Sequence, residues 1–413
     1  MIAAQAIHAA VAENLPEAVD HLCRLMAFPS LSGQEHEAML HLEQVFSDLG
    51  LTVERVPMRP DLLRDPDYSS PIPGLAMEGR FNLRVVCPGR SARKIILNAH
   101  VDVVPLAEGM AWGSRREGET IFGRGACDDK GPLITLWLVA ATLTRAGVEP
   151  PCEIVLHLVN EEENGGNGSL QMIRHGERAD ACIVMEPTEG RVFSSIRGAV
   201  WFRIDFRGQA GHSGQPGVTR SALTMAREAM TALEDYHRRL LAESAGLPLF
   251  EAYPNPMPLT FGRLEAGNWP AAAPQHARLE GVLGFLPNRT RDQVCAELRA
   301  ALLDAGQLKA DDFELGFTYR HDCSMLDPEH FLARDLVQAA RQAGYDSRID
   351  AMTASCDAWF YNNQLSIPTV VFGPGSLRWA HTREEQIAIP EIARAAEAIL
   401  LSILNSTGLQ DDA

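Results

Sequence analysis

The sequence lacks the closely spaced cysteines of a thiolate metal site or a disulfide framework. Its eight cysteines are scattered over 413 residues, and none forms a Cys-x-x-Cys pair. That spacing disfavours both a cysteine-bound zinc ion and a network of disulfides. Several of the cysteines stand in apolar, strand-like stretches, which is typical of buried free thiols.

Long apolar stretches and basic charge are also scarce. The longest mainly apolar run, residues 133–143, is too short to span a bilayer, and the N-terminus lacks the basic and apolar segments of a signal peptide. The 37 basic residues are outnumbered by 54 acidic ones, which gives a formal net charge of −17. This charge disfavours a nucleic-acid surface or an anionic membrane as a partner. We therefore expect a cytoplasmic protein that binds neither nucleic acid nor membrane.

The order of the expected elements divides the chain into two domains. Residues 1–196 and 320–413 alternate strand-like and helical segments, which predicts a catalytic α/β domain with a mostly parallel sheet. Residues 197–319 instead follow the order β-α-β-β-α-β, which is typical of a ferredoxin-like α+β fold. We expect this smaller domain to be inserted into the larger one, because a chain of this length exceeds a single core.

A His-x-Asp motif stands where an apolar strand is expected to end. The run 95–99 leads into His100 and Asp102, and residues two apart in a strand share a face. A metal-bound histidine commonly donates its second ring N–H to a carboxylate, which fixes the tautomer. Taken alone, the motif is more typical of an ordinary surface turn, and only the residues further along the chain favour a metal ligand.

Further acidic and histidine residues end strands or occupy glycine-rich turns. They are Asp128, Glu162, Glu163, Glu186 and His381. In open α/β sheets, functional sites gather beyond the carboxyl ends of the strands. Two imidazoles with three carboxylates suit a pair of zinc-like ions with one bridging carboxylate, and a fourth carboxylate remains as a base. Each motif alone is an ordinary turn, but their combination favours a metal centre.

In this order the motifs resemble the two-zinc metallopeptidases that include acetylornithine deacetylase, succinyl-diaminopimelate desuccinylase, aminoacylase and glutamate carboxypeptidase. The resemblance implies that Asp128 of Gly123-Arg124-Gly125-x-x-Asp128 bridges the metals. It assigns the other ligands and their orienting carboxylate by the same match: His100, Glu163, Glu186 and His381, with Asp102 beside His100.

The resemblance also implies the reaction. Glu162 would act as general base on a hydroxide held between two divalent ions, with zinc expected and cobalt or manganese as alternatives. His212, in Gly211-His212-Ser213, would help to hold the oxyanion from the partner subunit of a homodimer formed through the inserted lid domain. The substrate would be an N-acyl amino acid or a short peptide, cleaved at its amide bond.

Two alternatives stay open. The segment Asp129-Lys130-Gly131-Pro132 is closer to the dipeptidase branch of the family, so a dipeptidase or carboxypeptidase is the second reading. The third is a non-catalytic binding protein that keeps the fold, although no expected ligand is missing.

The sequence departs from the family at substrate contacts. Ala271 occupies the position of a common lid asparagine, and Val282-Leu283-Gly284 replaces a common Asp-x-Arg. Specificity therefore cannot be transferred from relatives. Arg320 falls where relatives place an arginine for the substrate carboxylate, a group that guanidinium binds in a bidentate manner. The loop around Gly375 is expected to add backbone N–H donors to the same group.

Overall fold

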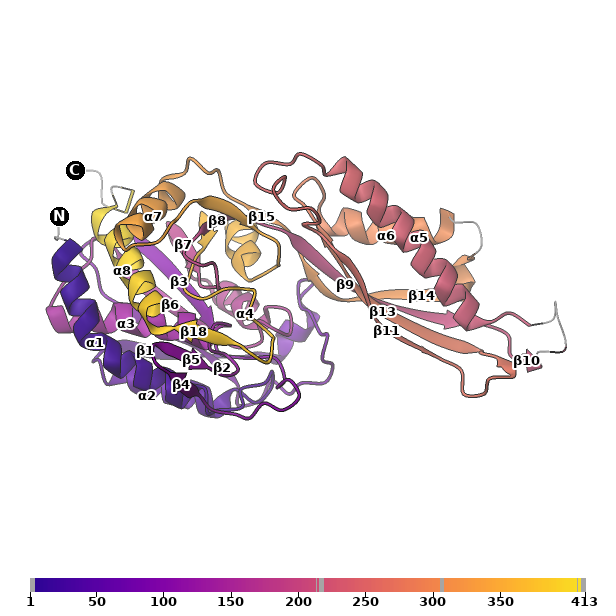
Figure 1. Cartoon of the computed structure of the whole chain (residues 1–413), viewed down its shortest axis with the longest axis horizontal. Helices are drawn as coiled ribbons and strands as arrows, with labels where there is room; N and C mark the ends of the chain where they lie inside the picture. Colours follow the sequence, from indigo (N-terminus) through magenta and orange to yellow (C-terminus); the bar gives the residue numbers. More distant parts are fainter. Residues whose placement is uncertain (1–3, 213, 215–218, 305–307, 407, 410–413) are drawn as a thin grey trace.

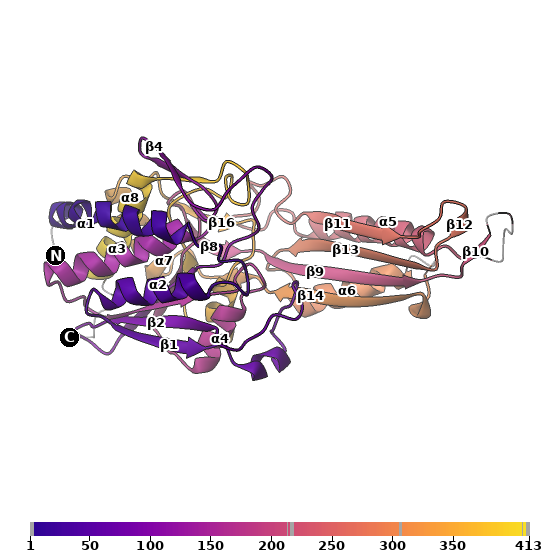
Figure 2. The ribbon, with the colours of Figure 1, turned by 90° about the horizontal axis from the view of Figure 1, so that it is seen from below.

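The computed structural model describes residues 4–212, 214, 219–304, 308–406 and 408–409. Two parts are visible in both views: a thick body and a narrower, elongated part beside it (Figures 1 and 2). We call residues 198–321, from the first to the last long strand of the elongated part, the outer lobe, and the remainder the main body. No helix of the described chain is long and apolar enough to cross a membrane.

The main body is built on a mixed sheet of nine strands, counted over the described residues. Their order is β1-β2-β6-β3-β7-β17-β8-β15, and β16 pairs with β8. The central strands β6, β3, β7 and β17 run parallel, whereas β1, β2 and β15 add antiparallel edges. The bounds are Thr52–Pro57 (β1), Phe81–Cys87 (β2), Lys94–His100 (β3), Glu153–Val159 (β6), Ala181–Val184 (β7), Val192–Ile196 (β8), Ser324–Met325 (β15), Ile349–Met352 (β16) and Thr369–Val371 (β17).

Helices cover both faces of this sheet because its central strands are apolar on both sides. In β3, Ile95 and Leu97 belong to the core under α1, α2, α3, α7 and α8, whereas Ile96 belongs to the core under α4. Alternate side chains of a strand point to opposite faces, which produces these two cores. The helices span Ala4–Leu25 (α1), His36–Ser47 (α2), Lys130–Ala146 (α3), Asn167–His175 (α4), Phe331–Gln342 (α7) and Ile389–Asn405 (α8).

The outer lobe has an antiparallel sheet of its own, in the order β11-β13-β9-β14. Two helices pack on one face, against Phe202, Ile204 and Phe206 of β9, and the intervening residues of that strand lie on the open face. The bounds are Gly198–Arg207 (β9), Ala222–Glu243 (α5), Leu259–Ala266 (β11), His276–Phe285 (β13), Arg291–Asp304 (α6) and Phe313–His321 (β14). A βαββαβ unit with this strand order is ferredoxin-like. The expected fold class is therefore confirmed, while the domain boundaries at 197 and 319 stay predictions.

Two small sheets complete the fold. A ribbon of β10 (Gly211–His212) and β12 (Ala272–Ala273) forms the tip of the outer lobe, far from the main body in both views (Figures 1 and 2). In the main body, β4 (Arg115–Glu117), β5 (Thr120–Phe122) and β18 (Gln386–Ala388) pair side by side. This second sheet holds the turn before α3 next to the loop that carries His381.

Candidate metal centre

The carboxyl ends of β3 and β7 bring together three of the expected ligands. His100 ends β3, Glu186 follows β7, and Asp128 lies in the turn before α3. One donor atom of each lies within 4.8 Å of the other two, and all three residues are buried. The His100 Nε2 atom is 3.2 Å from Asp128 Oδ1.

A second group shares Asp128 with the first. The His381 Nε2 atom lies 3.1 Å from Asp128 Oδ2 and 3.0 Å from Glu163 Oε1. Asp128 therefore turns one carboxylate oxygen toward each histidine, as a bridging ligand must. The two groups contain all five residues that the sequence predicts as ligands.

The chemistry of these donors suits divalent cations. No lysine or arginine pairs with Asp128, Glu163 or Glu186 within the described residues, although all three carboxylates are buried or half-buried. Buried carboxylates require a partner or a metal ion. Imidazole nitrogens and carboxylate oxygens are donors that zinc-like ions accept, so the residues present fit such ions.

The pKa values report the same concentration of charge. Burial raises the pKa of Glu186 well above its usual range, and the nearby Asp128 and Glu162 raise it further. Hydrogen bonds that the His381 ring donates to the carboxylates of Asp128 and Glu163 raise its pKa to about 11. The negative charge that the clustered carboxylates bring to this point of the fold contributes to both shifts.

Asp102 contacts the centre in a way that the His-x-Asp spacing did not reveal. The His100 Nδ1 atom is 3.0 Å from the Asp102 carbonyl oxygen and 3.6 Å from its carboxylate. That carboxylate instead accepts the backbone N–H groups of Glu162 at 3.0 Å and Glu163 at 3.1 Å. Asp102 therefore connects the histidine strand to the turn that carries both glutamates.

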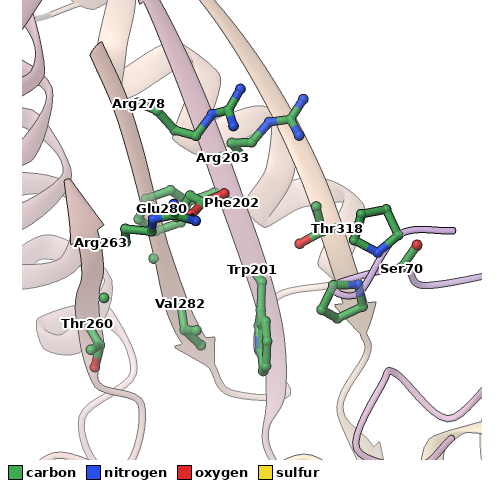
Figure 3. A pocket seen from close by; sticks show the side chains of 14 residues that line it. Ser70, Trp201, Phe202, Arg203, Thr260, Arg263, Arg278, Glu280, Val282 and Thr318 are labelled. Atoms are coloured by element: carbon green, nitrogen blue, oxygen red, sulfur yellow. The ribbon is translucent and has the colours of Figure 1, made fainter. Parts of the chain in front are cut away.

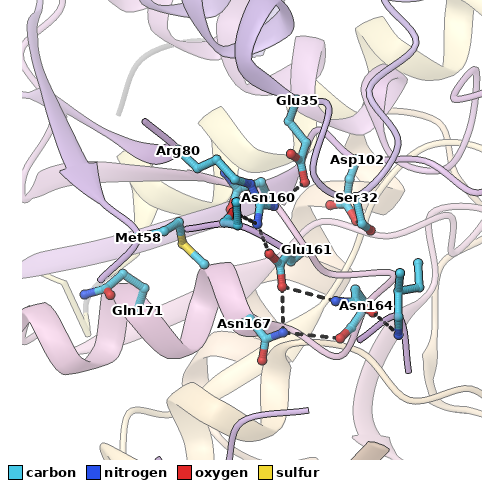
Figure 4. Close-up of polar contacts among 12 residues, drawn as sticks. Ser32, Glu35, Met58, Arg80, Asp102, Asn160, Glu161, Asn164, Asn167 and Gln171 are labelled. Carbon is cyan, nitrogen blue, oxygen red and sulfur yellow. Dashed lines mark hydrogen bonds and ion pairs between the residues drawn. The ribbon is translucent and has the colours of Figure 1, made fainter. Parts of the chain in front are cut away.

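A buried ion network holds the same turn from its other side (Figure 4). Arg80 pairs with Glu35 at 2.7 Å and with Glu161, whose backbone has a positive φ of 58°. The second Glu161 oxygen accepts hydrogen bonds from Asn167 at 2.7 Å and Asn164 at 3.3 Å. This network has no signature in the sequence, because Arg80 lies in a distant part of the chain and carries no local motif.

Glu385 and Asp357 are two further buried carboxylates that the sequence did not single out. Glu385 pairs with Arg124 and accepts the backbone N–H groups of Cys127 and Asp128, each at 3.3 Å. Burial raises the pKa of Glu385 to about 7. Asp357 accepts the Ser169 hydroxyl at 2.6 Å. Glu385 stands in a polar segment that resembles a solvated loop, and Asp357 stands in a segment without a recognised motif, so only their position in space distinguishes them.

Three other predicted residues lie in different surroundings. His212 is at the tip of the outer lobe, and Ser213 beside it lies outside the described residues. The Arg320 guanidinium donates to the Pro66 carbonyl, and the Gly375 N–H donates to Glu391 at 3.2 Å. Their predicted contacts with oxyanion or substrate stay predictions.

Where relatives carry Asp-x-Arg, this chain has Gly284, and the side chain of another arginine lies beside it. A Cβ atom on Gly284 would lie 2.5 Å from a terminal nitrogen of Arg197, so that guanidinium fills the space beside the glycine. Arg197 also donates to the Thr353 carbonyl, which ties the junction between β8 and β9 to the main body.

Comparisons with known proteins agree with this site. The model of peptidase family M20/M25/M40 matches residues 96–405. A deformylase of N-formyl-4-amino-5-aminomethyl-2-methylpyrimidine from Bacillus subtilis is 24% identical over 75% of this chain and 79% of that protein. Succinyl-diaminopimelate desuccinylase from Methylocella silvestris is 28% identical over 77% of this chain and 83% of that protein.

Among solved structures, the Saccharomyces cerevisiae dipeptidase Dug1p has the same fold. It superposes with a TM-score of 0.77 at 13% identity, over 97% of this chain and 98% of that one. The matched family segment contains every residue of both donor groups. The protein is therefore a hydrolase that belongs to peptidase family M20/M25/M40.

Proposed function

We propose that this protein hydrolyses the amide bond of an N-acyl amino acid, with Glu162 as general base. One observation carries the proposal: Glu162 lies close enough to His100 and Glu186 for its charge to raise their pKa values, and its carboxylate makes no hydrogen bond to another described residue. A general base must be close to the reacting water without being engaged as a ligand. Relatives that include a deformylase and a desuccinylase support an acyl substrate.

The five donors would hold two divalent cations, zinc being expected. His100 and Glu186 belong to one group, Glu163 and His381 to the other, and Asp128 to both. Bound cations of this kind polarise an amide carbonyl and lower the pKa of water. Asp102 fixes the backbone of Glu162 and Glu163, so the base and its neighbouring ligand keep a constant separation.

Proton transfer is the task left to Glu162. Burial raises its pKa well above the usual range, and the charges of Asp357 and Glu163 add to the effect while His100 opposes it. A carboxyl group in such surroundings accepts a proton readily, and a protonated carboxyl can then donate it to the leaving amine.

His212 is proposed as the oxyanion donor, acting from the second subunit of a homodimer. It lies at the tip of the outer lobe, on the side away from the main body of its own chain (Figure 1). A preorganised donor is needed where negative charge develops on the attacked carbonyl oxygen. A second copy whose tip reaches this main body would supply it.

A dipeptidase is the second candidate, supported by Asp129-Lys130-Gly131-Pro132 and by the likeness to the fold of Dug1p. Arg320 and Gly375 would bind the substrate carboxylate in either case. The Gly375 N–H can do so only by leaving Glu391, whereas Arg320 donates to the Pro66 carbonyl through one of its terminal nitrogens.

Amine release from a mixed panel tests the proposal. Acetyl-, formyl- and succinyl-amino acids are compared with dipeptides, using protein loaded with zinc or cobalt. Glu162→Gln should reduce kcat about 10²–10⁴-fold, the usual contribution of a general base, while metal content stays the same. Glu314→Gln, an exposed position on β14, is the matched control.

Each result has a defined meaning. Turnover of one acyl series supports the acylase proposal, and turnover of dipeptides alone moves the protein to the peptidase branch. Full activity of Glu162→Gln would exclude that residue as the base.

A further inference from the structure

A buried histidine of the outer lobe contacts the turn of residues 161–166, which carries the proposed base and is called the Glu162 turn. The Nε2 atom of His321, the last residue of β14, lies 2.9 Å from the Gly165 carbonyl oxygen. A carbonyl oxygen only accepts, so Nε2 carries a hydrogen and donates it. Trp359 and Phe360 pack against the imidazole, with 5.3 and 5.2 Å between ring centroids. The outer lobe therefore supplies an enclosed donor to the Glu162 turn.

The peptide group that accepts this hydrogen bond also closes the turn. Its N–H belongs to Gly166 and donates to the carbonyl oxygens of Glu161 at 2.8 Å and Glu162 at 3.0 Å. A peptide group is planar, so the direction of its C=O sets the direction of its N–H. By holding the Gly165 carbonyl, His321 therefore also fixes the N–H that binds the backbone of both glutamates.

Two hydroxyl groups hold the imidazole in one tautomer. The Tyr319 hydroxyl oxygen lies 2.8 Å from His321 Nδ1 and 2.8 Å from Ser355 Oγ. Burial lowers the pKa of His321 to about 3, so the ring is neutral and carries its one hydrogen on Nε2. Nδ1 therefore accepts the Tyr319 hydroxyl, whose oxygen in turn accepts the Ser355 hydroxyl. Donors and acceptors thus run in one direction, from Ser355 to the Gly165 carbonyl.

An irregularity in β14 turns these side chains toward the main body. Between Phe317 and Tyr319 the strand gains one residue relative to β9, and Tyr319 then lies opposite Trp201. One extra residue exchanges the two faces of a strand, so Tyr319 and His321 share the open face with Trp201. The Tyr319 and Trp201 rings stack there, with 5.1 Å between centroids and 19° between planes. The stacking holds the tyrosine beside the histidine that it orients.

A glycine lets the strand and the turn approach each other. Gly165 has a φ of +102°, and a Cβ atom there would lie 2.2 Å from Ser69 Cβ and 3.3 Å from the Tyr319 ring. The next residue, Ser70, lies beside Thr318 of β14 (Figure 3), and its N–H donates to the Thr318 carbonyl at 2.7 Å. Both the backbone conformation and the close packing at residue 165 therefore require glycine.

We propose that His321, oriented by the Tyr319 hydroxyl, positions Glu162 for proton transfer, so that the outer lobe helps to set the geometry of the base. Asp102 and Arg80 hold the same turn from the main body, and His321 is its anchor from the lobe. His321 and Tyr319 act through the backbone of the turn and are positioning residues. The proposal rests on the proposed hydrolysis with Glu162 as base.

Kinetics of three variants test the assignment. His321→Leu removes the donor and should lower kcat about tenfold to 10²-fold, because small displacements of a reacting group are costly. KM should stay within about twofold, and metal content should not change. His321→Gln keeps an N–H donor and should recover part of the lost kcat, and Tyr319→Phe should lose less than His321→Leu. Equal losses in the Leu and Gln variants, or a change confined to KM, would overturn the proposal.

A second buried tyrosine–histidine pair supplies the matched control. The Tyr361 hydroxyl lies 3.0 Å from His157 Nδ1, and within the described chain neither side chain hydrogen-bonds to the Glu162 turn. Tyr361→Phe removes the same group as Tyr319→Phe but should leave kcat within about twofold. Thermal unfolding checks that both variants keep the fold. An equal fall of kcat in Tyr361→Phe would overturn the assignment.

Amide hydrogen exchange separates this proposal from the proposed reaction. In metal-loaded protein without substrate, the Gly165 and Gly166 N–H groups should exchange about three- to tenfold faster in His321→Leu, the effect of losing one hydrogen bond. Tyr361→Phe should not accelerate these two amides. Unchanged exchange in His321→Leu would overturn the proposal, whatever the activity of the protein.

A double variant tests whether His321 acts through Glu162. In the Glu162→Gln background, His321→Leu should no longer lower kcat, because the group that it positions is already absent. A full additional loss in the double variant would overturn the proposal. Full activity of Glu162→Gln alone would instead exclude the proposed base, while hydrogen exchange would still decide whether His321 holds the turn.

Discussion

The main body and the outer lobe use charged side chains in opposite ways. Around the metal centre, Arg80 and Glu161 expose 7% and 0% of their side chains, and their contacts fix the backbone of the Glu162 turn. On the open face of the outer lobe, Arg207 and Glu314 expose 67% and 70%. Buried charges in the body hold a geometry, whereas exposed charges in the lobe remain available to a ligand or a second subunit. Substitutions of buried charges in the body should therefore lower the stability of the fold, whereas substitutions in the lobe should change activity or binding with little loss of stability.

Removing the buried guanidinium should have the largest effect. Arg80→Met leaves Glu35 and Glu161 without their shared cation, and breaking a buried pair in this way typically costs about 3–5 kcal/mol. Denaturant unfolding measures the free energy, and kcat should fall as the Glu162 turn loosens. Arg80→Lys, which keeps the charge, should lose less. A cost below about 1 kcal/mol would show that the network does not stabilise this turn.

The tip of the outer lobe should affect catalysis with little change in stability. His212→Ala should lower kcat about 10²–10³-fold, the usual effect of losing one oxyanion donor. The side chain is exposed, so the unfolding free energy should change little. Mixing His212→Ala with Glu162→Gln protein should restore part of the activity, because one of the two sites in a mixed dimer has both residues. Failure to recover activity would place His212 outside the partner's site.

The contrast also explains what the sequence could predict. The five expected ligands each follow a strand or a glycine-rich turn, and their combination, together with the family resemblance, was enough to select them. They are His100, Asp128, Glu163, Glu186 and His381, and the structure brings them together. The alternation of elements likewise predicted the fold class. The last strand of the inserted domain was expected within residues 197–319, and β14 continues to His321 because its pairing with β9 extends that far.

Contacts between segments that are distant in the chain could not be predicted from local sequence patterns. Arg80 and Glu161 come into contact only when β2 and β6 pair, and no sequence motif near either residue indicates the contact. Glu385 stands in a polar segment that would be taken for a solvated turn, yet it is fully buried against Arg124. The orientation of the Asp102 carboxylate also depends on where the Glu162 turn lies in space.

A buried histidine of the main body should make stability depend on pH. His157 is buried beside the Tyr361 hydroxyl at 3.0 Å, and burial lowers its pKa to about 3. The unfolded chain binds this proton near its ordinary pKa of 6.5, so the unfolded state holds more protons between pH 6.5 and about 3. Stability contributed by His157 is therefore present above pH 6.5 and is lost as the pH falls.

Unfolding free energies of wild type and His157→Gln across this range measure the effect. The variant should reduce the slope of unfolding free energy against pH by up to about 1.4 kcal/mol per pH unit. His276→Gln, at an exposed position of β13, controls for the substitution itself. Parallel pH profiles for wild type and His157→Gln would contradict the prediction.

The exposed pair Arg207–Glu314 should show the smallest effect. A double-mutant cycle with Arg207→Gln and Glu314→Gln should give a coupling energy of about 0.2–1 kcal/mol, because water screens exposed ion pairs. The coupling should also weaken as salt is added. A larger, salt-resistant coupling would mean that this face of the lobe is covered in solution. In the proposed dimer, a second copy of the chain would cover this face. The double-mutant cycle therefore also tests whether the charges of the outer lobe are exposed to solvent.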